Sequence, residues 1–297
     1  MPTPAEPLTE VLDRVWEEQG RIGFLLPVSE EIEIRRVQDP ISAVSFRFRW
    51  LPHRELRGDL AELEARGIVS PDRRDTELFR DPRDPPGRFC FLCARNIRVS
   101  NPKEELVPLS LAGRDFYAGA NFAWIARGHF TVMSAEHRDQ EFTDGTLAAM
   151  LDLHAQAGGE YRVVYNAPHG GASIPWRLHL QTSRERFPVE DLPEGFEDRW
   201  PTALWRFSDG AGPALDFVAD WRRRDPAHHR VNALVAGSRV SPTIHVFPRD
   251  TRRSHAWAKG LMGGFEVCGD FVYSEADKRD TFETASAELA RSILEKI

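Results

Sequence analysis

The chain has 297 residues, of which 41% are hydrophobic and 29% are charged, which is typical of a globular protein with a large core. Its net charge of -7 argues against non-specific binding to nucleic acid, and no apolar run is long enough to cross a bilayer. The first residues lack the pattern of a signal peptide, and three cysteines are too few for a disulfide framework. We therefore expect a cytoplasmic protein with no nucleic-acid or membrane partner.

Hydrophobic periodicity predicts a mixture of helices and strands along the chain. Helices are predicted at 7–20, 143–157, 213–223 and from about 276 to the end, and the Thr-Asp pair that starts at Thr143 is suited to cap the second of them. Strands are predicted at 41–51, 119–126, 129–134, 161–165, 177–181, 203–207, 231–236, 243–248 and 264–273. The stretch 72–87 is dense in Arg, Asp and Pro and is interpreted as an exposed loop at a soft boundary. This order of elements predicts an α+β protein.

A segment that runs N-A-P-H-G-G-A-S-I-P-W-R-L-H-L-Q, residues 166–181, combines a glycine-containing loop with a short alternating stretch. Side chains two apart on a strand leave the same face of a sheet. Arg177, His179 and Gln181 should therefore point one way, and Leu178 and Leu180 the other.

A histidine on a polar strand face beside such a loop suits attack on a phosphate, because a neutral imidazole nitrogen is a good nucleophile for phosphorus. His179 is the candidate nucleophile. Gln181, Ser173 and the N–H groups of the glycine loop are donors of the kind that stabilise charge on phosphate oxygens. The alternative is that His179 is an ordinary packed strand histidine.

A second motif, Cys90-Phe-Leu-Cys93, has the spacing that lets two thiolates share one zinc ion. His129 and His137 follow as possible imidazole ligands. The alternative is a pair of core thiols without a metal.

Together these motifs resemble the histidine-triad (HIT) superfamily, in the branch of galactose-1-phosphate uridylyltransferase, diadenosine tetraphosphate phosphorylase and the GDP-hexose phosphorylases. The resemblance covers residues 89–181, and less specifically the C-terminal third. It implies a HIT/uridylyltransferase-like antiparallel sheet with flanking helices. It also implies an N-terminal segment packed on the core (1–87), a HIT-like catalytic half (88–190) and a C-terminal half that completes the fold (191–297).

The resemblance also implies roles for residues at matching positions. His179 matches the nucleophile that becomes nucleotidylated, while Gln181 and Ser173 match groups that hold the α-phosphate. The remaining positions that the resemblance assigns to substrate binding are Asn121, Phe122, Asn166, Gly171 and Ala172. Cys90, Cys93 and His137 match zinc ligands of the zinc-bearing members.

Arg177 departs from this pattern, because the family has a histidine there that supplies the fourth zinc ligand. A guanidinium has no free lone pair and stays protonated, so Arg177 cannot replace that ligand. Zinc is therefore either absent or held with another group, such as His129 or His169. Arg177 itself either grips phosphates or faces solvent. Arg249 and Lys259 belong to a basic cluster that either meets a phosphorylated substrate or is simply solvated.

The resemblance predicts a nucleotidyltransferase or phosphorylase that works through a nucleotidyl-histidine intermediate at His179. Its expected partners are a nucleotide or nucleotide-sugar substrate and a phosphate or sugar-phosphate acceptor, and a homodimer is common in the superfamily. The alternatives are a hydrolase of the same fold and a nucleotide-binding protein that has lost turnover.

Overall fold

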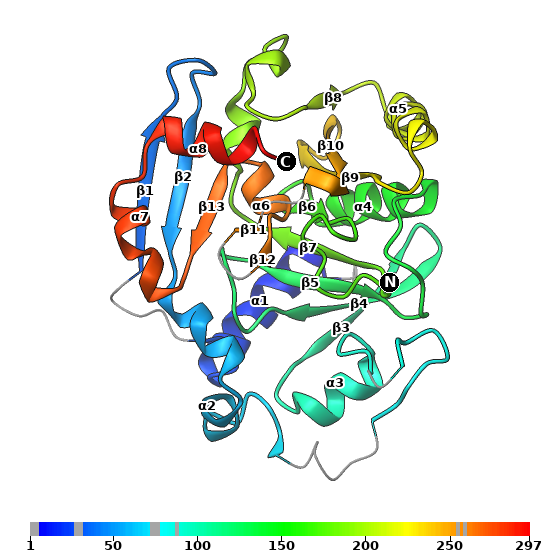
Figure 1. The fold of residues 1–297 in the computed structure, drawn as a ribbon. Coiled ribbons are helices and arrows are strands. Elements are labelled where there is room, and N and C mark those ends of the chain that lie inside the picture. Colours follow the sequence, from blue (N-terminus) through cyan, green and yellow to red (C-terminus); the bar gives the residue numbers. More distant parts are fainter. Residues whose placement is uncertain (1–5, 27–31, 72–77, 87–88, 254–255, 258–259) are drawn as a thin grey trace.

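An antiparallel sheet of eight strands forms the centre of the computed structural model (Figure 1). In order across the sheet the strands are β3 (Leu106–Leu111), β4 (Arg114–Ala120), β5 (Phe130–Ser134), β7 (His179–Ser183), β6 (Arg162–Tyr165), β9 (His229–Gly237), β10 (Pro242–Asp250) and β8 (Trp205–Phe207). The structure describes residues 6–26, 32–71, 78–86, 89–253, 256–257 and 260–297, with the backbone alone at 256–257 and 260–261.

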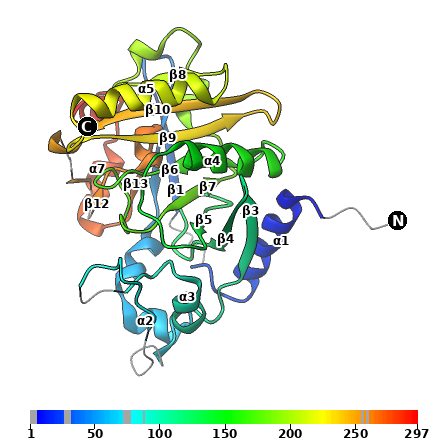
Figure 2. The ribbon, with the colours of Figure 1, turned by 90° about the vertical axis from the view of Figure 1, so that its right-hand side faces the viewer.

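One face of this sheet is covered by helices α1 (Leu8–Arg21), α4 (Asp144–Gln156) and α5 (Ala211–Arg224), as Figure 2 shows. Leu180 of β7 and Val132 of β5 point to this side and share one buried core with Leu12 of α1 and Leu147 of α4. The apolar stripe of each helix and one set of alternating strand residues therefore meet in a single core.

The other face carries a second, smaller sheet of three strands, β1 (Glu33–Gln38), β2 (Ser45–Trp50) and β13 (Asp270–Tyr273). Phe46 and Phe48 of β2 pack with Phe271 of β13 in a second core. Val164 of β6 and Leu234 of β9 contribute to that core from the large sheet. Because β2 pairs with β13 in parallel, early and late parts of the chain are joined.

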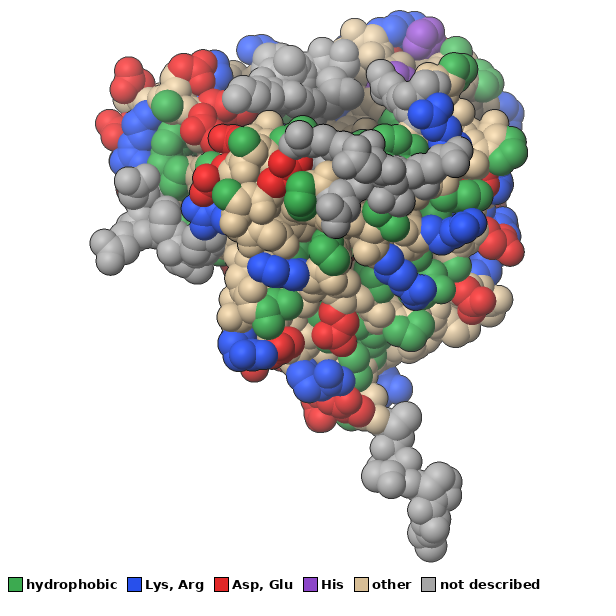
Figure 3. Space-filling model, turned by 90° about the horizontal axis from the view of Figure 1, so that it is seen from below, with side chains coloured by type: hydrophobic (Ala, Val, Ile, Leu, Met, Phe, Trp, Pro, Cys, Tyr) green, Lys and Arg blue, Asp and Glu red, His purple; other side chains and the backbone are tan. Residues whose placement is uncertain are grey.

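The remaining elements are short. They are α2 (Leu60–Ala65), α3 (Ala94–Ser100), α6 (Gly264–Val267), α7 (Arg279–Glu283), α8 (Ala287–Leu294), β11 (Ala256–Trp257), β12 (Gly260–Leu261), and the 3-10 helices η1 (Pro52–Gly58), η3 (Pro188–Asp191), η4 (Glu197–Arg199), η5 (Thr251–Arg253) and η6 (Ala276–Lys278). No helix among the described residues is both long and apolar enough to span a membrane. On the face seen in Figure 3, acidic and basic side chains are interspersed.

The predicted α+β class, with an antiparallel sheet and flanking helices, is confirmed. The predicted first helix corresponds to α1, and the predicted cap at Thr143 is present, since its side chain accepts a hydrogen bond from the N–H of Thr146 at the start of α4. The large sheet takes strands from both 88–190 and 191–297, while β1 and β2 come from 1–87. The three predicted parts therefore contribute to a common structure.

Three predicted elements are wrong in extent. The strand expected at 119–126 stops at Ala120, because the Asn121 side chain accepts a hydrogen bond from the N–H of Ala123 and turns the chain. The strand expected at 264–273 is α6 followed by β13. The single C-terminal helix is broken before Ser286, whose hydroxyl caps α8.

Candidate active site

His179 is the first residue of β7, and the alternation predicted for this segment is confirmed from there on. Leu178 and Leu180 lie in the core under the helices. His179 pairs opposite Met133 of β5 and lies two residues from Gln181, so both polar side chains leave the opposite face of the sheet. Arg177, however, lies before the strand and not on it.

The hydrogen bonds of the His179 ring set its tautomer. Its Nδ1 lies 2.8 Å from the carbonyl oxygen of Arg177, which can only accept, so Nδ1 carries the proton. Burial lowers the pKa of His179, which keeps the ring neutral and leaves a lone pair on Nε2. Among the described residues no hydrogen bond reaches Nε2, and the residue as a whole is 3% exposed. The ring therefore has a neutral form with an unshared electron pair on Nε2.

Gln140 holds the backbone of His179 in place, a role that the sequence does not reveal. Its side-chain oxygen accepts from the His179 N–H at 2.8 Å, and its amide nitrogen donates to the His179 carbonyl at 3.0 Å. The same amide donates to the carbonyl of Asn166 at 2.7 Å. Gln140 is 1% exposed, so it ties the start of β7 to the end of β6 from within the protein.

Asn166 connects three parts of the site. Its amide nitrogen donates to Gln181 at 3.3 Å, and its oxygen accepts from the backbone N–H of Gly264 at 2.5 Å and from the amide of Asn232 at 3.3 Å. Because Gln181 accepts from Asn166, its own amide N–H groups are free to point toward a ligand. Asn232, which the sequence analysis missed, also donates to the carbonyl of Gly170 at 2.8 Å and so fixes the glycine loop.

Gly171 allows that loop to pass close to the backbone before α6. It has φ +103°, and a Cβ added to it would lie 2.3 Å from Cα of Gly263. We expect Gly171→Ala to lower the free energy of unfolding by about 3 kcal/mol, because a backbone clash is added to an unfavourable φ. Gly195→Ala is the matched control: φ is +80° there but nothing lies within 4 Å, so about 1 kcal/mol is expected. Equal losses in urea unfolding would contradict the predicted clash.

Two adjoining cavities lie over the polar face of β7. The polar cavity has a volume of about 770 Å³ and is lined by residues that include Arg54, His129, Asn166, Gly171, Ala172 and Gln181. The apolar cavity has a volume of about 1060 Å³ and is lined by residues that include Leu63, Phe89, Phe91, Leu92, Ile97 and Met133. Both are lined by Arg57, Asn121, Phe122 and Ser173. Seven residues predicted to contact the substrate therefore line these two cavities, whereas His179, which is 3% exposed, lines neither. The seven are Asn121, Phe122, Asn166, Gly171, Ala172, Ser173 and Gln181.

Two further polar groups of the polar cavity were not predicted as substrate contacts. His129 accepts a hydrogen bond on Nδ1 from the N–H of Ile125 at 3.1 Å, and burial lowers its pKa to about 3, so it is neutral with a proton on Nε2. That buried Nε2–H has no hydrogen-bond partner in the described part of the chain. Arg54 from η1 adds a guanidinium, which donates to the carbonyl of Ala123. Both are donors available to an anion.

The basic residues expected near the substrate have other surroundings. Arg249 is 4% exposed and donates to the carbonyl of Met262 at 3.1 Å. Lys259 lies outside the described residues. Arg177 is 1% exposed and donates to the carbonyls of Ser134 and Ala135 at the end of β5. Its Nη2 is therefore engaged with backbone, while its Nε and Nη1 are buried without a hydrogen-bond partner among the described residues.

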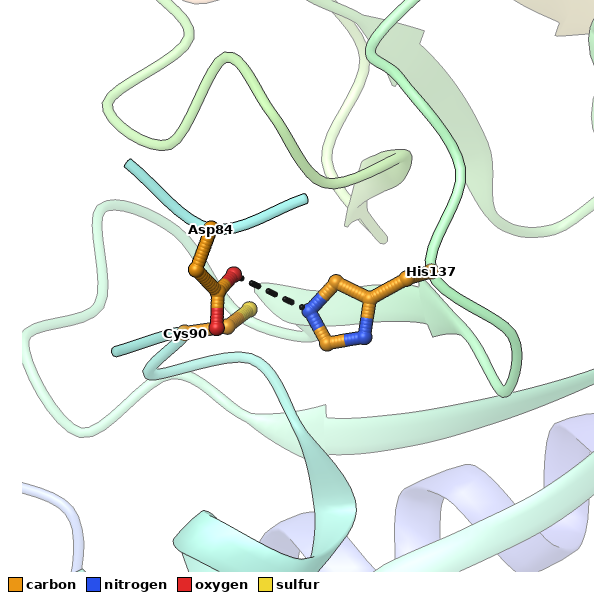
Figure 4. A group of neighbouring side chains, drawn as sticks. All are labelled: Asp84, Cys90 and His137. Carbon is orange, nitrogen blue, oxygen red and sulfur yellow. Dashed lines mark ion pairs between the residues drawn. The ribbon is translucent and has the colours of Figure 1, made fainter. Parts of the chain in front are cut away.

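Asp84, Cys90 and His137 form a compact group whose ligand atoms lie within 4.8 Å of one another (Figure 4). Oδ1 of Asp84 and Nε2 of His137 are 3.2 Å apart, yet neither is hydrogen-bonded to a described residue. That separation suits two ligands of one tetrahedral zinc, and carboxylate, thiolate and imidazole are zinc donors. Cys93, which the sequence analysis expected in this set, is not part of the group, whereas Asp84 was missed.

The surroundings of His137 favour its neutral imidazole, which is the form that binds a metal. Burial and then the Arg177 guanidinium lower the pKa of His137, so its imidazole is neutral at pH 7 and can offer a lone pair. Burial raises the pKa of the Cys90 thiol to about 11. A metal at this place would therefore displace the thiol proton when it binds.

The fold and the polar residues around β7 define an α+β protein with a candidate active site on its large antiparallel sheet. The family model DUF4922, described as a domain of unknown function, matches residues 71–184. A comparison with curated protein sequences finds no significant match.

The fold is similar to that of solved yeast Ap4A phosphorylase Apa2. One structure of that protein has a TM-score of 0.62 and 16% identity, with 97% of this chain and 96% of the other covered. Its complex with AMP has a TM-score of 0.59 and 17% identity, with 97% of this chain and 95% of the other covered. Its complex with Ap4A has a TM-score of 0.62 and 16% identity, with 98% of this chain and 97% of the other covered. At this identity the likeness shows a shared fold.

Proposed function

We propose that the chain is a nucleotidyltransferase or phosphorylase that acts on a nucleoside diphosphate-sugar or a dinucleoside polyphosphate through a covalent intermediate on His179. The observation that carries this proposal is the ring of His179, which is neutral, protonated on Nδ1 toward the Arg177 carbonyl, and unpartnered on Nε2 among the described residues. The fold likeness to an Ap4A phosphorylase supports the same reaction class.

In the first step the lone pair of Nε2 attacks the α-phosphorus, and the bond from that phosphorus to the bridging oxygen breaks. The bridging oxygen leaves with the electron pair, as part of a sugar phosphate or a nucleotide. The imidazole becomes positively charged, and its Nδ1–H points at the negative end of the Arg177 carbonyl, which stabilises that charge. Gln181 and Ser173, with the N–H groups of the glycine loop, donate to the non-bridging oxygens.

In the second step an oxygen of the acceptor attacks the same phosphorus, the P–N bond breaks, and its electron pair returns to Nε2. With inorganic phosphate as the acceptor the product is a nucleoside diphosphate, and with water it is a nucleoside monophosphate. Product analysis with and without phosphate therefore separates phosphorolysis from hydrolysis.

Intact-mass spectrometry after incubation with nucleotide sugars and dinucleoside polyphosphates tests the intermediate. We expect a mass gain of one nucleoside monophosphate that disappears when the acceptor is added. Tight nucleotide binding without an adduct or turnover would instead identify a binding protein that has lost catalysis.

We also propose that Asp84, Cys90 and His137 hold a zinc ion. Zinc would cross-link the segment before α3 to the segment after β5, and no step of the reaction requires it.

We expect the purified protein to contain about one zinc per chain by elemental analysis. Cys90→Ser should lose the metal and lower the melting temperature. Cys268→Ser is the matched control, because Cys268 is a buried thiol of the second core and should leave zinc bound. A metal-free wild-type protein would refute this site.

A further inference from the structure

Glu104, just before β3, places a carboxylate beside the apolar cavity. Its Oε2 accepts from the amide of Asn101 at 2.9 Å, and no ion pair joins Glu104 to any described residue. Its Oε1 lies where the side chain of Gly119 would be, since a Cβ added to Gly119 would be 2.1 Å from it. Burial raises the pKa of Glu104 to about 7. A partly buried carboxylate with no compensating cation among the described residues indicates a group kept for a ligand.

The position of this carboxylate relative to β7 follows from the strand register. Gly119 pairs with Thr131, and Thr131 pairs with Gln181, so all three lie on one face of the sheet. Two strand spacings separate Gly119 from Gln181, roughly 10 Å. This is comparable with the reach of a nucleoside monophosphate from its phosphate to the outer edge of its base. A nucleotide whose α-phosphate lies at His179 and Gln181 can therefore bring its base edge to Glu104.

The walls between these two points suit a base. Phe122 lines both cavities, and Phe89 and Phe91 line the apolar one with their ring centroids 4.7 Å apart. Phe91 is 52% exposed, which is unusual for so large an apolar side chain. Aromatic and aliphatic surfaces of this kind stack on the flat faces of bases.

Hydrogen bonds from two donors favour the ionised form of Glu104, which then has two adjacent acceptors and no donor. Guanine presents two adjacent donors, N1–H and the 2-amino group, on its base-pairing edge. Adenine presents an unprotonated N1 there, and uracil presents two carbonyls beside a single N–H. We propose that Glu104 selects guanine, so that the substrate is a guanosine diphosphate-sugar or a guanosine polyphosphate. This inference rests on the proposed function in one respect, because it takes the α-phosphate of the nucleotide to lie at His179.

Calorimetric titration with GDP, IDP, ADP and UDP at about pH 8, where Glu104 is mostly ionised, tests this choice. Wild type should bind GDP at least about 10-fold more tightly than ADP and UDP, because hydrogen bonds to a charged group are strong and an opposed acceptor leaves the carboxylate unpaired. IDP lacks the 2-amino group and should lie between GDP and ADP.

Glu104→Gln should weaken GDP binding by about 10- to 100-fold while leaving ADP binding nearly unchanged. The Asn101 amide can still donate to the glutamine oxygen, so the variant should keep its melting temperature. Glu105→Gln is the matched control, because this neighbouring glutamate is exposed and should leave all affinities unchanged. Equal affinity of wild type for GDP and ADP, or unchanged GDP binding by Glu104→Gln, would overturn the proposal.

Adduct formation on His179 tests the proposed reaction separately from the proposed choice of guanine. An adduct that forms equally well from adenosine and guanosine donors would refute guanine selection and leave the proposed reaction standing. If no nucleotide binds and no adduct forms, the proposed function itself is wrong.

Discussion

His179→Ala is expected to reduce nucleotidyl transfer by about 10⁴-fold or more and to abolish the covalent adduct, because the substitution removes the nitrogen proposed to form the P–N bond. The fold should survive this change. Gln140 holds His179 through its backbone N–H and carbonyl, and both remain in the variant. The measurements are the initial rate with a nucleotidyl donor that the wild-type protein turns over, the intact mass and the melting temperature.

Two controls sharpen this test. Free imidazole should restore part of the activity of His179→Ala, because the variant leaves a ring-sized space beside the polar face of β7. His228→Ala should be fully active, since His228 lies in the turn before β9 and its ring contacts Thr251. A fully active His179→Ala would remove the basis of the proposed mechanism.

Asp270→Ala is expected to lower the free energy of unfolding by about 3–5 kcal/mol, the largest stability effect that we predict. Asp270 and Arg49 are 1% and 2% exposed, and the carboxylate accepts two hydrogen bonds from the guanidinium, at 2.7 and 2.9 Å. Arg47 adds a third contact at 3.1 Å. Removing the carboxylate leaves the buried charge of Arg49 with the partly exposed carboxylate of Glu185 at 2.8 Å and the carbonyl of Ile125 at 3.3 Å.

Urea unfolding of Asp270→Ala against wild type measures this loss. Asp277→Asn is the control, because that carboxylate is 75% exposed and, within the described part of the chain, forms an ion pair with Lys278 alone, at 3.9 Å. We expect the control to change stability by less than about 0.5 kcal/mol. Similar losses in both variants would show that the pair between β2 and β13 does not stabilise the junction of the small sheet with the rest of the protein.

Several parts of the fold and site were accessible from local sequence patterns. The apolar stripe of α1, the cap at Thr143 and the alternation of β7 were all predicted from neighbouring residues. Helix ends and strand ends were less well predicted. Asn121 and Ser286 each direct a side-chain hydrogen bond to the backbone, and such bonds compete with the regular ladder without changing the hydrophobic pattern.

The sequence by itself determined the class of fold, the two faces of β7 and the identity of the candidate nucleophile, because periods of 2 and 3.6 residues are local. Only the tertiary structure decided which distant polar residues support that nucleophile. Gln140 lies 39 residues from His179, and Asn232 lies 66 residues from Asn166. Asp84 and Glu104 were likewise indistinguishable from solvated loop carboxylates. A polar residue in a loop has the same sequence signal whether water or a buried partner satisfies it, and strand pairing alone brings those partners together.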